Sequence, residues 1–406
     1  MKLPTRLIHN RKGNPERRTV NPPVERASTV ILPDRQTLYG GGTGYGRMGL
    51  SVHRELEAAL CDIEGASHAR LTPSGLSACA VGIASVVKAG DHVLLSDSVY
   101  GPTRRFCEKR LPLMGVSATR FNPRDTSALE KAITPETRLI VLESPGSLTF
   151  EISDTPAIVE IAKSAGVLTL MDNTWSAGVF HQPLDLGVDI SVQALTKYMV
   201  GHADAFGGAV MTRDKAHAHA VETLTEDWGI SLGPDDAYAG LRGTRTLSTR
   251  LKAHEASALE LARWLGGQDD VGLVIHPALP NHPDHETWKR DFSGSSGLFA
   301  ILLDAPEEAH IDAFLSALDL FKLGFSWGGF ESLIIPCDEQ LTRLPEDWTQ
   351  SRRGRLVRLH AGLEDTGDLI ADLERGLRAL HRADLPADRG QRSLGCPWEH
   401  QKKSWR

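Results

Sequence analysis

The sequence predicts an α/β protein in which a mostly parallel sheet is covered by helices and is followed by a smaller α+β domain. Short apolar runs alternate with amphipathic helical segments through the first half of the chain, which is typical of a parallel sheet with both faces covered. The 406 residues are also too many for one hydrophobic core, so two domains are expected.

The elements of the larger domain, predicted over residues 51–245, follow one another in the order that such a sheet requires. Helical spacing begins at Ser51, which is expected to be the N-cap of the first helix. Further helices are expected at 75–88 and around Ile158 to Ala165. Strands are expected at 92–96, 116–121, 139–142, 167–171 and 190–194.

The pattern changes near Arg245, where the domain boundary is placed. A long helix with leucines at positions 247, 251, 261 and 265 leads into the smaller domain, predicted over 246–388. Its expected strands are 271–275, 298–303 and 355–359, and its expected helices are 308–318 and 366–380.

The two ends of the chain lack this periodicity. Residues 1–50 are rich in Arg, Pro and Gly, which predicts an extended arm that contacts a neighbouring subunit. Residues 389–406 carry five basic residues against one acid and are expected to form a disordered tail, with a docking segment as the alternative.

Composition excludes several classes of function. Hydrophobic residues make up 41% and charged residues 24%, an ordinary mix for a soluble globular protein. The net charge of −7 argues against a general nucleic-acid binder. No apolar run approaches the roughly 18 residues of a membrane span, and the first ten residues lack the apolar core of a secretory signal. Five scattered cysteines without a Cys-x-x-Cys pair predict reduced thiols and a cytoplasmic location.

Lys197 carries the most chemical information. It stands after an apolar run with Thr196 beside it, and Asp172 ends an earlier run. Enzymes that use pyridoxal phosphate (PLP) bind it through such a lysine and pair an acid with its ring nitrogen, while a hydroxyl can reach its phosphate. Alone, the lysine could be solvated and the aspartate could cap a loop; together they predict a PLP site.

Two further segments suit the same cofactor. Gly75 and Leu76 open the helix expected at 75–88, where free N–H groups could bind a phosphate, although an ordinary N-cap at Ser74 is the alternative. Tyr100 ends another strand-to-loop crossing, where its ring could stack on a flat cofactor or simply pack in the loop.

The segment from Gly44 to Gly49 matches the dinucleotide pattern G-x-G-x-x-G, but no strand precedes it, so nucleotide binding is not predicted. Tyr45 and Arg47 are instead interpreted as a phenol and a cation on a flexible loop, able to hold a phosphate.

Two other groups of polar residues have competing interpretations. Arg358 lies inside a strand pattern and is a candidate for binding a substrate carboxylate, or for a structural ion pair. His276, His282 and His285 lie in a Pro-rich loop that is expected to be solvated, and their spacing predicts no metal site.

Taken together, the motifs resemble the Cys/Met-metabolism family of PLP-dependent enzymes of fold type I, over about residues 37 to 380. The resemblance rests on Tyr45-Gly-Arg47, Leu142-Glu-Ser-Pro-Gly146, Met171-Asp-Asn-Thr-Trp175, Thr196-Lys-Tyr-Met-Val-Gly-His202, Asp291-Phe-Ser-Gly-Ser-Ser-Gly297, Ser326-Trp-Gly-Gly329 and Arg358-Leu-His-Ala-Gly-Leu-Glu-Asp365.

The resemblance implies a role for each candidate residue. The expected catalytic residues are Lys197, which binds PLP and later carries the proton, and Tyr45 and Tyr100. Cofactor binding is expected from Lys197, Asp172 at the ring nitrogen, Tyr100 stacked on the ring, and Gly75, Leu76 and Thr196 at the phosphate, with Tyr45 and Arg47 reaching the phosphate of a neighbouring subunit. Substrate binding is expected from Arg358, Ser326 and Trp327.

The implied reaction is Cβ–S cleavage of L-cystathionine to homocysteine, pyruvate and ammonia in methionine biosynthesis, by a homotetramer of paired dimers. The β-lyase interpretation depends on Phe325-Ser326-Trp327, because relatives that act at Cγ usually have Glu-Ser-Leu there. The remaining alternatives are a cysteine-S-conjugate β-lyase or cysteine desulfhydrase of broad specificity, a γ-acting sibling, a PLP-binding regulator without catalysis, and a Rossmann oxidoreductase. Leu195 departs from many γ-acting relatives, which have Ser at that position.

Overall fold

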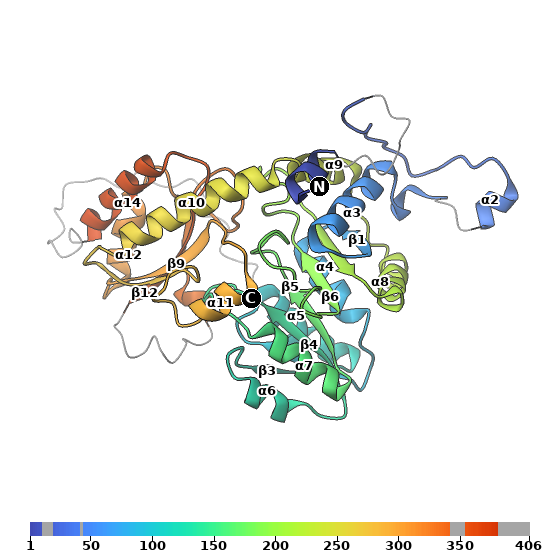
Figure 1. The fold of residues 1–406 in the computed structure, drawn as a ribbon, viewed down its shortest axis with the longest axis horizontal. Helices are drawn as coiled ribbons and strands as arrows, with labels where there is room; N and C mark the ends of the chain where they lie inside the picture. The colour runs from blue at the N-terminus through green and yellow to red at the C-terminus, as the bar shows by residue number, and fades with distance from the viewer. Residues whose placement is uncertain (10–18, 41–43, 342–353, 381–406) are drawn as a thin grey trace, which may run out of the picture.

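The computed structural model describes residues 1–9, 19–40, 44–341 and 354–380. Helices and strands form two sheet-centred regions, and the long helix α10 (Leu247–Leu265) runs between them (Figure 1). The predicted tail at 389–406 lies outside the described residues.

The larger sheet has seven strands in the order β1-β7-β6-β5-β4-β2-β3. Strand β7 runs antiparallel to both of its neighbours, and the other neighbouring pairs are parallel. The predicted mostly parallel sheet is therefore confirmed. The strands are β1 (His68–Thr72), β2 (His92–Ser96), β3 (Ser117–Phe121), β4 (Thr137–Glu143), β5 (Leu168–Asp172), β6 (Ile190–Gln193) and β7 (Gly208–Thr212).

Both faces of this sheet are buried under helices. Side chains alternate across a strand, so Val93 and Leu95 join one apolar cluster with α4 (Gly75–Ala84), while Leu94 joins another with α7 (Thr155–Ala165). The other helices of this region are α3 (Ser51–Glu64), α5 (Gly101–Lys109), α6 (Thr126–Ala132), α8 (Lys215–Asp227) and α9 (Pro234–Thr244).

The smaller sheet has five strands in the order β10-β11-β12-β9-β8, and all neighbouring pairs except β10 and β11 are antiparallel. Its elements are β8 (Val271–Ile275), α11 (His285–Asp291), β9 (Leu298–Leu303), α12 (Glu308–Ser316), β10 (Lys322–Leu323), β11 (Leu333–Pro336), β12 (Arg355–His360) and α14 (Thr366–Leu380).

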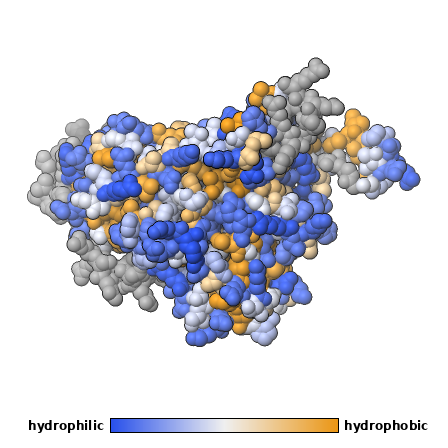
Figure 2. Space-filling view, viewed as in Figure 1, coloured by the Kyte–Doolittle hydropathy of each residue, from blue (hydrophilic) through white to orange (hydrophobic). Residues whose placement is uncertain are grey.

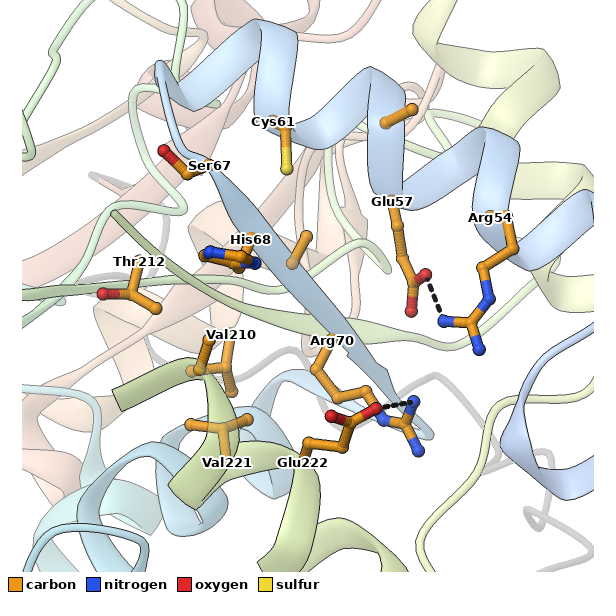
Figure 3. Close-up of a pocket in the computed structure, with 13 residues that line it drawn as sticks. Arg54, Glu57, Cys61, Ser67, His68, Arg70, Val210, Thr212, Val221 and Glu222 are labelled. Atoms are coloured by element: carbon orange, nitrogen blue, oxygen red, sulfur yellow. Dashed lines mark hydrogen bonds and ion pairs between the residues drawn. The ribbon is translucent and has the colours of Figure 1, made fainter. Parts of the chain in front are cut away.

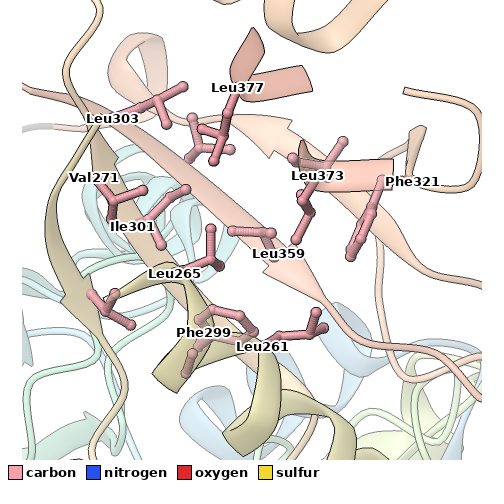
Figure 4. Close-up of a cluster of buried hydrophobic side chains, with 14 of the residues drawn as sticks. Leu261, Leu265, Val271, Phe299, Ile301, Leu303, Phe321, Leu359, Leu373 and Leu377 are labelled. Atoms are coloured by element: carbon pink, nitrogen blue, oxygen red, sulfur yellow. The ribbon is translucent and has the colours of Figure 1, made fainter. Parts of the chain in front are cut away.

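The two faces of the smaller sheet have different partners. Phe299 and Leu359 point to a core shared with Leu261 of α10 and Leu373 of α14 (Figure 4). Alternate residues, such as Leu356, pack instead against apolar side chains of the larger region, including Phe150 and Trp175. Because Arg358 shares the face of Leu356, strand β12 directs it toward the larger sheet.

The N-terminal segment is less extended than predicted, because it contains α1 (Leu3–Ile8) and α2 (Arg35–Tyr39). Helix α1 buries Leu7 in a cluster with α3, whereas the part around α2 projects from the body of the molecule (Figure 1). Apolar side chains are exposed on this arm (Figure 2): Ile31 is 94% and Leu38 is 51% exposed.

The predicted N-cap at Ser51 is wrong by one residue. Leu50 is the N-cap of α3, and its N–H donates to Nδ1 of His53 at 3.1 Å. The Ser51 hydroxyl donates instead to Glu25 at 2.9 Å, so a tertiary contact takes the side chain away from the helix end. The helix predicted at 75–88 also ends earlier, at Ala84.

Among the described residues, no helix combines the length and apolar character needed to cross a bilayer.

Candidate active site

A cavity of about 840 Å³ lies between the carboxyl ends of strands of the larger sheet and the smaller sheet. Nine of the residues predicted for the site line it: Gly75, Leu76, Tyr100, Asp172, Thr196, Lys197, Ser326, Trp327 and Arg358. Residues far apart in the sequence therefore converge on one space, as the resemblance implied.

Lys197 lies in the turn after β6. Its amine donates to the Ser326 hydroxyl at 2.8 Å and lies 5.2 Å from the centre of the Trp327 ring. Burial lowers the pKa of Lys197 to about 8, and the positive charge of Arg358 acts in the same direction. A buried lysine with a lowered pKa is uncharged in a larger fraction of molecules at neutral pH, which favours nucleophilic attack and proton transfer.

Asp172 ends β5 at the floor of the cavity. Its Oδ1 accepts from the N–H of Thr174 at 3.1 Å and from the Thr174 hydroxyl at 2.5 Å. Its Oδ2 accepts from the thiol of Cys79 at 3.5 Å, a weak donor. Burial raises the pKa of Asp172, so a cation at this carboxylate would relieve an unfavourable buried charge.

The start of α4 provides backbone N–H groups. Ser74 is the N-cap, and its hydroxyl oxygen accepts from the N–H of Ser77 at 3.1 Å, whereas the N–H groups of Gly75 and Leu76 precede the first intrahelical bond. A Cβ at Gly75 would lie 2.4 Å from Cβ of Ala194, so only glycine allows the helix to approach β6 this closely.

Thr196 is less free than predicted. Its hydroxyl donates to the carbonyl of Gly207 at 3.2 Å and accepts from the N–H of Gly207 at 3.2 Å. To bind a phosphate, the Thr196 hydroxyl would have to break its hydrogen bond to the carbonyl of Gly207 and donate to a phosphate oxygen instead.

Arg358 is a buried cation at the opposite side of the cavity, 8% exposed. Burial lowers its pKa, which means that its positive charge is poorly solvated. Among residues 1–9, 19–40, 44–341 and 354–380, no carboxylate lies within ion-pair distance of Arg358. The structural ion pair considered from the sequence is therefore not found in this part of the chain, and a planar guanidinium remains for a carboxylate ligand.

The loop that carries Ser326 is held in an unusual backbone conformation. Ser326 has φ of 121°, a region that side-chain-bearing residues rarely adopt. Gly328 has φ of 82°, and a Cβ there would lie 2.8 Å from the backbone nitrogen of Tyr198. The loop therefore packs directly on the segment that carries Lys197, and this contact keeps Ser326 against the lysine.

Tyr45 and Arg47 do not line this cavity. Tyr45 is 49% exposed, and Arg47 donates to the carbonyl of Glu226 at 3.2 Å. Within one chain they lie apart from Lys197, and their expected role at a neighbouring subunit's phosphate stays a prediction.

Three cavity-side contacts were not foreseen from the sequence. Glu143 ends β4 and accepts from the N–H of Tyr100 at 2.6 Å, and burial raises its pKa well above the usual value. Thr174 and Cys79 both hold Asp172, as described above. Glu143 and Thr174 lie within the motifs on which the resemblance rests, and these motifs could have indicated that both residues belong to the site. Nothing in the sequence around Cys79 indicated its contact with Asp172.

A second, smaller hollow of about 340 Å³ lies between α3, β1 and α8 (Figure 3). Its charged groups pair with one another: Arg54 with Glu57 at 2.9 Å, and Arg70 with Glu222 at 3.7 Å. It contains none of the predicted site residues, so it is not the candidate active site.

In the part of the chain that the structure describes, no three His, Cys, Asp or Glu side chains are placed to hold a metal ion. The expectation of a solvated histidine loop is wrong, because His276 and His282 are 0% and 5% exposed. The His276 ring packs against Phe299 of the smaller sheet, and burial lowers the pKa of His276 to about 3.

The cavity offers a group for each part of PLP. The start of α4 suits an anionic phosphate, the buried Asp172 carboxylate suits a protonated ring nitrogen, and Lys197 suits the aldehyde. The residues present therefore fit this cofactor.

Comparisons with known proteins agree with this fit. The model of the family described as Cys/Met metabolism PLP-dependent enzyme matches residues 4–378. Cystathionine beta-lyase MetC from Escherichia coli is 39% identical, over 93% of this chain and 99% of the relative. Cystathionine beta-lyase from Bordetella avium is 41% identical, over 88% and 92%. An L-alanine/L-glutamate racemase from Wolbachia pipientis is 36% identical, over 91% and 95%.

The crystal structure of metB from Corynebacterium glutamicum superposes with a TM-score of 0.87 at 28% identity, covering 94% of this chain and 99% of that one. The fold, the cavity and the family match point to the same assignment. The chain belongs to the Cys/Met metabolism family of PLP-dependent enzymes.

Proposed function

We propose that this chain is a cystathionine β-lyase, which converts L-cystathionine and water to homocysteine, pyruvate and ammonia in methionine biosynthesis. The observation that carries the proposal is the buried Arg358 guanidinium, which shares one cavity with Lys197 and has no carboxylate partner among the described residues. The relatives with that name from Escherichia coli and Bordetella avium support it.

Arg358 binds the α-carboxylate of the substrate and so fixes the direction of its Cα–H bond. A guanidinium can bind both carboxylate oxygens, which restricts rotation of the substrate. Ser326 lies beside Lys197 and provides a second polar contact for the same carboxylate. When bound, PLP supplies an electron sink for the negative charge that develops at Cα.

Lys197 moves the protons. Its uncharged amine takes the proton from Cα, and the resulting ammonium then gives a proton to the leaving sulfur as the Cβ–S bond breaks. The pKa of about 8 suits both steps, because the amine gains and loses a proton near neutral pH. Asp172 keeps a proton on the ring nitrogen of the cofactor through its buried carboxylate.

The tyrosines have separate roles in this proposal. Burial raises the pKa of Tyr100, so its side chain stays a neutral phenol, which would hold the cofactor ring by stacking. Tyr45 and Arg47 of one subunit would complete the site of its neighbour, where Arg47 would hold the PLP phosphate and the Tyr45 phenol would accept a proton from the substrate amine.

The assembly proposed with this function is a homotetramer of paired dimers in the cytoplasm. Exposed apolar side chains on the projecting arm, such as Ile31, favour a partner for residues 1–50. We place the domain boundary of this proposal at the start of α10, with the PLP-binding domain before it and the smaller domain after it.

The side chains at the cavity mouth favour β-elimination. Phe325 is 82% exposed and lines the cavity together with Trp327, where a γ-acting relative would carry an acid at position 325. The apolar side chains of Phe325 and Trp327 can pack against the thioether chain of cystathionine. They place no carboxylate beside the leaving group.

A panel of substrates tests this proposal against its rivals. The ratio kcat/KM is compared for L-cystathionine, L-cysteine and O-succinylhomoserine, and racemisation of L-alanine and L-glutamate is followed in parallel. The proposal predicts the highest value for L-cystathionine. A preference for cysteine would indicate a C–S lyase of broad specificity, and a preference for O-succinylhomoserine would indicate a γ-acting enzyme. Rapid racemisation would indicate the activity named for the Wolbachia relative.

A further inference from the structure

Glu64, the last residue of α3, is fully buried beneath the strand ends that carry the candidate site, with 0% exposure. Its Oε1 accepts from the side-chain amides of Asn173 at 3.1 Å and Gln193 at 2.5 Å. Its Oε2 accepts from Asn173 at 3.1 Å and from the hydroxyl of Ser191 at 2.9 Å. One carboxylate therefore connects α3 to β6 and to the residue after β5.

The two amides are oriented by further contacts. The amide nitrogen of Asn173 also donates to the carbonyl of His181 at 3.1 Å, while its oxygen accepts from Ser176 at 2.6 Å. The amide nitrogen of Gln193 also donates to the carbonyl of Asn173 at 2.8 Å. Both amides thus present N–H groups to Glu64. These amides favour the ionised form of Glu64, because a proton on its carboxylate would face their N–H groups.

This network continues into the cavity. Asn173 follows Asp172, and Gln193 precedes Ala194, whose N–H donates to the hydroxyl of Thr174 at 2.9 Å. Thr174 in turn holds Asp172 at 2.5 Å. Glu64 therefore fixes, from behind, the two strand ends that position the floor of the site.

Glu64 and Asp172 are two acidic groups in the same buried region. Burial raises the pKa of Glu64 to about 7, its hydrogen bonds to Gln193, Ser191 and Asn173 oppose this, and the charge of Asp172 adds to the rise. A cation placed at Asp172 would stabilise both carboxylates.

We propose that Glu64 is a positioning residue for the cofactor: its carboxylate fixes the ends of β5 and β6, and its negative charge strengthens the hold of Asp172 on a protonated ring nitrogen. This inference rests on the role proposed above for Asp172 and is independent of the substrate. It predicts that Glu64 contributes to PLP affinity without touching PLP.

The test is Glu64→Gln, which keeps the size of the side chain but removes the charge and turns an amide NH2 group toward other hydrogen-bond donors. The PLP dissociation constant and the rise in Tm on adding PLP to PLP-free protein are measured at pH 8 without substrate. The dissociation constant should increase roughly tenfold, as expected for the loss of one nearby unit charge in a protein interior, and the PLP-induced rise in Tm should shrink.

A purely structural role gives a different result. It would lower the Tm of the PLP-free and PLP-bound forms equally and leave the PLP-induced rise unchanged, which would overturn the proposal. Glu57→Gln is the matched control, since Glu57 lies on the same helix and pairs with Arg54 at 2.9 Å outside the cavity. It should bind PLP like the unaltered protein.

Should Glu64→Gln not fold, Ser191→Ala tests the same point. Loss of the Ser191 hydrogen bond raises the pKa of Glu64 further, so fewer molecules carry its charge at pH 7. The PLP-induced rise in Tm of Ser191→Ala should be smaller than that of the unaltered protein at pH 7 and equal to it at pH 9. A rise at pH 7 as large as that of the unaltered protein would overturn the proposal. Asp172→Asn tells the two proposals apart: unchanged PLP affinity in that variant would overturn the role of Asp172 itself.

Discussion

The amine of Lys197 lies 2.8 Å from the hydroxyl of Ser326, although the two residues are 129 positions apart. Lys197 follows β6 of the larger sheet, whereas Ser326 follows β10 of the smaller one. The contact forms only when the two sheets pack against each other, so the candidate site depends on the arrangement of both regions.

Lys197→Ala should reduce turnover of L-cystathionine roughly a thousandfold or more, because proton transfer at Cα loses its base and acid. PLP should still bind through the other contacts, which the PLP content of the purified variant measures. Lys131→Ala, on the exposed surface of α6, is the control and should keep full activity. Near-normal turnover in Lys197→Ala would refute its assignment.

Arg358→Lys should lower kcat/KM roughly a hundredfold, mainly through KM, because a lysine cannot bind both carboxylate oxygens in the plane of a guanidinium. Arg355→Lys is a matched control on the same strand, where Arg355 pairs with Asp338 at 3.3 Å and is partly exposed. The values of kcat and KM are measured for both variants. An equal loss of kcat/KM in the two would show that Arg358 contributes only to stability.

The rate at which Lys197 captures PLP should depend on pH. The uncharged amine is the nucleophile, and a pKa lowered to about 8 means that this form dominates above pH 8. Incorporation of PLP into PLP-free protein should therefore reach half of its maximal rate near pH 8 and level off above about pH 9. The reaction of PLP with free Nα-acetyl-lysine, measured at the same pH values, shows how much of the pH dependence comes from titration of PLP itself. A rate that still climbs at pH 10 would indicate a lysine with an ordinary pKa.

Gly75→Ala should weaken PLP binding and lower the Tm. The added Cβ would lie 2.4 Å from Cβ of Ala194, and such overpacking costs about 1–3 kcal/mol while it moves the start of α4. Gly101→Ala, also at the start of a helix beside the cavity, has its nearest neighbour at 3.9 Å and should change little. Thermal melts and PLP titrations compare the two; equal behaviour would argue against a close approach at Gly75.

Much of the larger sheet was predictable because its central strands are continuous apolar runs. The strand predicted at 92–96 matches β2, and 190–194 is one residue longer than β6. Strand β1 was missed because His68 and Arg70 interrupt its apolar pattern. Arg70 is buried through tertiary contacts, which include the hydroxyl of Thr225 on α8 and the carbonyl of Met48. Strand β7 was missed because it begins at Gly208, the second of two consecutive glycines, and such a pair resembles a turn in the sequence.

The site was predictable as a set of residues but not as a network. Lys197, Asp172 and Arg358 lie in recognisable motifs, and folding brings them to one cavity. The contact between Cys79 and Asp172 joins α4 to β5, and no local pattern indicates it. Glu64 was missed for the same reason, since an acid at a helix end is usually solvated and its burial depends on β5 and β6.

Identifying the products that the PLP-loaded protein forms from L-cystathionine is the most direct test of β-elimination by this chain. Pyruvate together with homocysteine is predicted, because cleavage at Cβ–S separates a three-carbon fragment from homocysteine. Formation of 2-oxobutyrate together with cysteine would contradict the β-lyase proposal, since it requires cleavage at Cγ–S.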